Sequence, residues 1–138
     1  MKTNLKIGQT AYYIRTITDG DVYNFESITG DRNPLCTNEL YWKEAGFTKK
    51  LVQNIYIQGL ISATLGAKMP GFGSIYLEQE TQFLKNVFAN DTVIVKAIVE
   101  KIIEKKNFII SKIKIECYNQ DEELVATGTA TVIPPTIE

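Results

Sequence analysis

The stretch that decides the fold is IYIQGLISATLGA, Ile55 to Ala67. Its apolar residues fall nearly all round a helical wheel, and no residue in it carries a charge. A helix of this kind is buried in a core rather than laid on a surface. The run Met69-Pro70-Gly71-Phe72-Gly73 ends it, because proline and glycine interrupt helices. The sequence therefore predicts one buried helix in the middle of the chain.

The residues after this helix alternate in the pattern of β-strands. Ser74 to Phe83 is expected to form a first strand, and three further strands follow it. Their inward faces are expected to be Val93, Val95, Ala97 and Val99; then Ile109, Ile113, Ile115 and Cys117; then Leu124, Ala126, Gly128, Ala130 and Val132. Residues 119–122 form the last hairpin, and Asn90 supplies left-handed backbone angles to the turn in the connection 85–91.

The residues before the central helix are predicted to form short helices and loops. Thr18 is a suitable N-cap for a first helix that Gly30 ends. Residues 31–34 are expected to be a loop, because Pro34 disfavours helical angles at the residue before it. A second short helix covers residues 38–45, and residues 6–16 form an edge strand or an extended arm.

These elements together predict an α+β fold: a curved antiparallel sheet wrapped around a central helix. At 138 residues the chain is expected to be a single domain over residues 1–138. One face of so small a sheet packs on its helix. A homodimer or higher homo-oligomer that continues the sheet across an edge would complete such a structure.

Composition excludes several kinds of function. A formal net charge of −1 argues against nucleic-acid binding, which needs a basic surplus. The chain has no histidine, so it cannot form a Ser-His-Asp or Cys-His catalytic site, and with two cysteines it offers no metal site. We also expect no cofactor, because no phosphate-binding glycine loop is present. No apolar run is long enough to cross a membrane and no signal peptide opens the chain, so we expect a cytoplasmic protein with no membrane partner.

The candidate reactive residues lie in one short segment, Gly30-Asp31-Arg32-Asn33-Pro34-Leu35-Cys36. One interpretation is a plain turn, in which the Asp and Asn side chains bond their own backbone and Pro34 stiffens the exit. The functional interpretation is a carboxylate and a second proton-bearing group, Asp31 and Cys36, held on one rigid loop.

This segment resembles the Gly-Asp-x-Asn-Pro-(Leu/Ile)-His signature of the MaoC-like, R-specific enoyl-CoA hydratases. The resemblance extends over about residues 7–134 and includes Gly59-Leu60-Ile61-Ser62, the run from Pro70 to Leu77, and Asn90-Asp91-Thr92-Val93. Membership of that family implies the hot-dog fold, usually as a dimer. It also implies an acyl-CoA thioester as substrate or ligand, and hydration of a trans-2-enoyl-CoA to (R)-3-hydroxyacyl-CoA.

The resemblance also assigns roles. In the family, the Asp and His of the loop activate one water, and a Ser on the central helix steadies the Asp; these positions correspond to Asp31, Cys36 and Ser62. Asn33 and Pro34 would shape the loop. A backbone N–H at the start of the central helix, here that of Asn54, would receive the thioester oxygen.

Three positions depart from the family pattern: Cys36 replaces the His, Gln53-Asn54 replaces His-Gly, and Asn90 replaces a turn Gly. Asn tolerates glycine-like angles, so we expect the backbone path to be kept at both Asn positions. Cys36 should be a neutral thiol, with its pKa raised further by the Asp31 carboxylate. We therefore expect weakened hydratase activity.

Two other functions stay open: a non-catalytic acyl-CoA-binding or structural homologue, and a thioesterase that uses Asp31 with water. The acyl pocket is also left with two interpretations. The residues that could line it, and that core packing explains equally well, are Ile57, Leu60, Ile61 and Tyr76.

Overall fold

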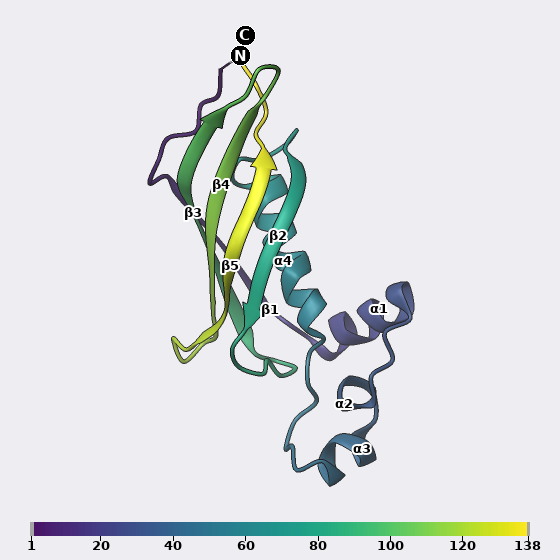
Figure 1. Ribbon diagram of the computed structural model, residues 1–138. Coiled ribbons are helices and arrows are strands. Elements are labelled where there is room, and N and C mark those ends of the chain that lie inside the picture. Colours follow the sequence, from purple (N-terminus) through teal and green to yellow (C-terminus); the bar gives the residue numbers. More distant parts are fainter. Residues whose placement is uncertain (1, 138) are drawn as a thin grey trace.

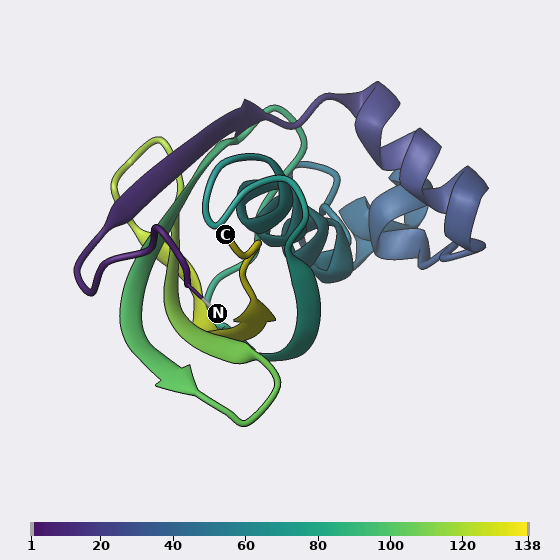
Figure 2. The same ribbon diagram turned by 90° about the horizontal axis from the view of Figure 1, so that it is seen from above.

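The computed structural model describes residues 2–137 and contains five strands and four helices in this part of the chain. The elements in chain order are β1 Thr10–Thr16, α1 Asp19–Thr29, α2 Pro34–Thr37, α3 Glu39–Glu44, α4 Asn54–Ala67, β2 Ile75–Phe83, β3 Thr92–Glu104, β4 Ile109–Tyr118 and β5 Leu124–Ile133. The predicted α+β arrangement is confirmed, because the strands form one curved sheet around α4 (Figures 1 and 2).

The sheet is antiparallel at every pairing and has the strand order β1-β3-β4-β5-β2. Residues 10–16 are therefore an edge strand, one of the two forms expected for this segment. Alternation is complete in β4, where every second residue from Ile109 to Cys117 is buried. In β3 it holds from Val93 to Val99. These faces pack against α4 and form one core.

Helix α4 lies in the hollow of the sheet and is only half covered. Ile57, Leu60, Ile61 and Leu65 are buried against the strands. The opposite face carries Ile55, which is exposed along with Gly59, Ser62, Ala63 and Gly66. The expectation of a helix buried all round is thus wrong for the single chain, because the sheet curls around one side of the helix only.

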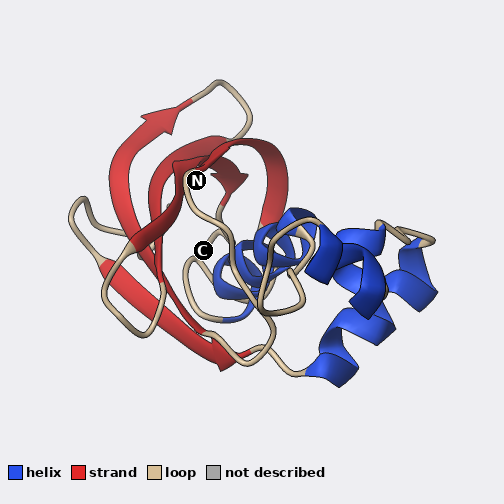
Figure 3. Cartoon of the chain, turned by 90° about the horizontal axis from the view of Figure 1, so that it is seen from below, coloured by secondary structure: helices blue, strands red, loops and turns tan. Residues whose placement is uncertain are grey.

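The three short helices lie beyond the N-terminal end of α4, on one side of the molecule (Figures 1 and 3). Thr18 caps α1 through a reciprocal pair of bonds with Asp21, and Gly30 ends the helix with a φ of 78°. The loop is shorter than predicted, because Pro34 is already the first residue of α2. Proline suits that position, where its fixed φ is helical and its missing N–H is not needed.

Two backbone positions restrict which residue can occupy them. Asn90 has a φ of 74°, which confirms the left-handed turn expected there. Gly128 lies where β5 passes β2, and a Cβ at this position would lie 1.9 Å from the carbonyl oxygen of Glu80. Only glycine permits this approach. Among residues 2–137, no helix has the length and apolar character to cross a membrane.

Candidate active site

The loop between α1 and α2 is held by hydrogen bonds between side-chain oxygens and nearby backbone N–H groups. The Asp31 N–H donates to Thr29 Oγ1 at 3.1 Å, and Asp31 Oδ1 accepts from the Asn33 N–H at 3.3 Å. Asn33 Oδ1 in turn accepts from the Leu35 N–H at 3.1 Å and caps α2. These short-range bonds, followed by Pro34, hold the Asp31 carboxylate on a rigid turn. The segment therefore has the geometry of the plain turn, as one interpretation predicted. The same hydrogen bonds would also hold a functional carboxylate in place.

A cavity of about 370 Å³ lies between this loop and the start of α4. Its lining residues are Asp31, Asn33, Leu35, Cys36, Leu51, Val52, Gln53, Asn54, Ile55 and Asn86. The fold thus brings together four of the residues predicted from the sequence, namely Asp31, Asn33, Cys36 and Asn54. Two of them come from the α1–α2 loop, one from α2 and one from α4.

The N-terminus of α4 opens into the cavity. Gln53 is its N-cap residue and makes no side-chain capping bond, so the first-turn N–H groups are not capped by a side chain. Such groups are donors for an oxyanion. Asn54 is the first residue of the helix and does not have positive φ, so the tolerance of Asn for glycine-like angles is not needed at this position. The helix itself fixes this backbone, and the Asn54 side chain is free for another role.

Cys36 lies at the wall of the cavity and is 4% exposed. Burial and, to a smaller extent, the nearby Asp31 carboxylate raise the pKa of its thiol, Lys50 opposes both effects, and the resulting pKa is about 11. The expected direction is therefore confirmed, with burial as the larger cause. The thiol is neutral over the physiological pH range and does not act as a base.

Ser62 is not brought to Asp31 in the single chain. It lies on the exposed face of α4, and no hydrogen bond of its side chain is found among residues 2–137. The steadying role implied for it stays a prediction. Of the residues suggested for an acyl pocket, Ile57, Leu60 and Ile61 belong to the core, and half-buried Tyr76 packs against it. Leu60 also lines a separate cavity of about 370 Å³, together with Phe25 and Tyr56.

Two residues of the site were missed as functional candidates. Gln53 is 4% exposed and donates from Nε2 to the Val22 carbonyl at 3.3 Å, while its Oε1 is buried without a partner. Asn86 reaches the cavity from the β2–β3 connection. Gln53 was visible as a departure from the family pattern, whereas no motif marks Asn86, which tertiary packing alone places here.

Comparison with known proteins agrees with this architecture. The family model described as "MaoC like domain" matches residues 3–118. An (R)-specific enoyl-CoA hydratase of Rhodospirillum rubrum is 32% identical over 132 residues, covering 96% of this chain and 90% of that protein. A mitochondrial 3-hydroxyacyl-(acyl-carrier-protein) dehydratase of Solanum lycopersicum is 34% identical over 133 residues, covering 96% and 79%. The solved structure of the (R)-hydratase of A. caviae superposes with a TM-score of 0.90 at 28% identity, covering 97% of this chain and all of that one. The sheet around a helix is thus the hot-dog fold of those hydratases.

Proposed function

Because the chain belongs to the MaoC-like domain family, we propose that it hydrates a trans-2-enoyl-CoA to (R)-3-hydroxyacyl-CoA, and catalyses the reverse dehydration. The observation that carries the proposal is the shared cavity: the Asp31 carboxylate and the uncapped N-terminus of α4 line the same space. Relatives named as enoyl-CoA hydratases and as 3-hydroxybutyryl-CoA dehydratase support the same reaction.

Addition of water needs a base for its proton, a place for negative charge and a proton for the α-carbon. The N–H groups at the start of α4 would donate to the thioester oxygen, where charge develops as water attacks the β-carbon. Asp31 would take the proton of the attacking water and deliver it to the α-carbon, so the carboxylate is restored when the C–O and C–H bonds have formed. No net proton is gained or lost.

Cys36 is the reason to expect slow turnover. A buried thiol with a pKa of about 11 neither accepts nor releases a proton readily near neutral pH. Loss of one positioned acid–base group typically lowers a rate by about 10²–10⁴-fold. We therefore assign both proton transfers to Asp31. The same feature favours the second candidate, an acyl-CoA-binding protein without catalysis.

Purified protein with crotonyl-CoA separates these functions. Loss of the enoyl thioester absorbance that Asp31→Asn abolishes and Cys36→Ala retains would support hydration through Asp31. A thermal shift with CoA esters and no turnover would favour binding alone, and release of free thiol would favour a thioesterase. Loss of activity in Cys36→Ala with activity kept in Asp31→Asn would refute the assignment.

We further propose that the chain works as one domain over residues 1–138, in a homodimer in the cytoplasm. Strand β2 has one free edge, where Ile75 and Leu77 are exposed. Helix α4, which has one uncovered face, lies next to this strand (Figure 1). A second copy added at this edge would continue the sheet and cover that face. The two free cysteines suit a reducing compartment. Light scattering on the eluted protein tests the dimer, and a monomer mass would refute it.

A further inference from the structure

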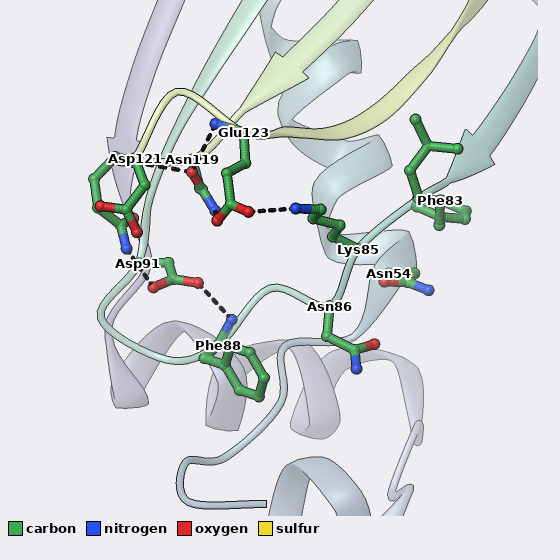
Figure 4. Close-up of a pocket in the computed structure, with 11 residues that line it drawn as sticks. Asn54, Phe83, Lys85, Asn86, Phe88, Asp91, Asn119, Asp121 and Glu123 are labelled. Carbon is green, nitrogen blue, oxygen red and sulfur yellow. Dashed lines mark hydrogen bonds and ion pairs between the residues drawn. The ribbon is translucent and has the colours of Figure 1, made fainter.

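The candidate active site continues into a second, larger cavity. This outer cavity of about 550 Å³ lies between the β2–β3 connection and the β4–β5 hairpin (Figure 4). Asn54 and Asn86 line both the outer cavity and the cavity that holds Asp31. The two cavities therefore meet at these two side chains. A ligand that has its reacting end near Asp31 would extend outward past Asn54 and Asn86.

The junction is lined by carboxamides that have hydrogen-bonding capacity to spare. The side chains of Asn54 and Asn86 are exposed, and neither makes a hydrogen bond within the part of the chain that the structure describes. Beside them, Gln53 has a buried Oε1 without a partner. A buried acceptor left unpaired costs about 1–3 kcal/mol, so a ligand that supplies a donor here would be favoured. Asn54 is not needed for the backbone path, so its carboxamide is free to bind.

The charged residues that line the outer cavity are Lys85, Asp91, Asp121 and Glu123, and all but Asp121 are already engaged. Lys85 is paired with Glu123, which also accepts from Asn119 at 3.1 Å. Asp91 accepts from the Gln120 side chain and from the Phe88 N–H, both at 2.9 Å (Figure 4). The cavity thus offers no free cation for a phosphate. What remains available near the junction is neutral: carboxamide donors and acceptors beside the apolar side chain of Phe83.

We propose that the outer cavity holds the pantetheine arm of the thioester, with the carboxamides of Asn54 and Asn86 bonded to its amide groups. The proposal rests on the proposed function, since it takes the thioester oxygen to lie at the start of α4. The arm leaves the sulfur as an uncharged chain with two amides, each with one N–H donor and one C=O acceptor. A carboxamide side chain is the complement of such a group, since it has two donors and an acceptor. The phosphates of the carrier lie outside the cavity.

Each cavity has a suitable size for such an arm. Pockets for small molecules typically measure about 300–1,000 Å³, and both cavities fall within this range. The inner one would hold the short acyl group and thioester, and the outer one the arm. Because pantetheine is common to coenzyme A and to acyl carrier protein, the cavity recognises the part that the two carriers share.

Calorimetric binding of butyryl-pantetheine tests the proposal without relying on turnover, because a saturated acyl group cannot be hydrated. We expect Asn86→Ala to weaken binding by about three- to tenfold, the effect of one lost hydrogen bond. The matched control is Asn107→Ala, the same change on the exposed β3–β4 turn outside both cavities, which should leave binding unchanged. Unchanged binding in Asn86→Ala, or an equal loss in Asn107→Ala, would overturn the proposal.

Three further ligands locate the contact and distinguish the carriers. Butyryl-CoA and a butyryl acyl carrier protein should lose the same factor in Asn86→Ala as butyryl-pantetheine, and the carrier that binds the unaltered protein more tightly is the natural one. Adenosine 3′,5′-bisphosphate, which lacks the arm, should lose nothing; a comparable loss would place Asn86 against the nucleotide and refute the assignment. If binding depends on Asn86 but the protein does not hydrate crotonyl-CoA, only the proposed function is refuted. If the protein hydrates crotonyl-CoA but binding does not depend on Asn86, only the inference about the pantetheine arm is refuted.

Discussion

Replacement of Cys36 by histidine would add a proton carrier to the cavity that already contains Asp31. A positioned general acid–base group contributes about 10²–10⁴-fold to a rate, which corresponds to roughly 3–5.5 kcal/mol of activation free energy. Cys36 lines a cavity of about 370 Å³, so an imidazole on α2 can extend into that space toward Asp31. If the ring pointed into the core instead, overpacking would cost about 1–3 kcal/mol of stability. We therefore expect Cys36→His to hydrate crotonyl-CoA at least about a hundredfold faster than the unaltered protein.

The assay follows the fall in enoyl thioester absorbance, with kcat/KM measured from pH 5 to pH 9. A catalytic histidine should add a titration near its ordinary pKa of about 6.5 to the pH profile. Cys36→Ser, which has no such group, is the control at the same position, and Asp31→Asn in the Cys36→His background should remove the gain. A Cys36→His protein that keeps the melting temperature of the unaltered chain and gains no activity would refute the reasoning, because the loop and helix would then not form a hydration site.

Three other outcomes follow from the geometry. Gly128→Ala should lower the free energy of unfolding by at least about 3 kcal/mol, because the added Cβ would meet the backbone of β2 at 1.9 Å; Gly20→Ala, with ordinary space in α1, serves as the control, and equal denaturation midpoints would contradict this. Asn33→Ala should cost about 0.5–2 kcal/mol by removing the cap of α2, with most of the loss recovered in Asn33→Ser, as urea titration would show. Stability should fall as pH rises from about 9 to 11, since the Cys36 thiol stays protonated in the folded chain while it ionises in the unfolded chain. Denaturation of Cys36→Ala should be less steeply dependent on pH in this window, and an identical slope would exclude the thiol as a cause.

Local features of the sequence predicted most of the elements. Thr18 and Gly30 mark the ends of α1 because capping depends on a few adjacent residues. The inward faces of β3 and β4 could be predicted because alternation is a property of the chain itself. The prediction is only partly right for β5, where Val125 and Thr131 are buried and Leu124 and Gly128 are only half-buried. Helix α4 was harder, since apolar residues on all sides do not reveal which side the sheet will cover. The same limit applies to Ser62, because its sequence position did not reveal that it would lie on the exposed face of α4.

The candidate site divides in the same way. Asp31, Asn33 and Pro34 lie within four positions of one another, so their motif determines a rigid carboxylate-bearing loop whatever surrounds it. The sequence also determined that no histidine is available and that Cys36 occupies the expected position of one. Only the tertiary structure decided that Cys36 is buried with a pKa of about 11, because desolvation depends on everything packed around the thiol. It alone placed Asn86 and Asn54 in the lining of the same two neighbouring cavities, because contacts between distant segments arise from packing and leave no local pattern in the chain.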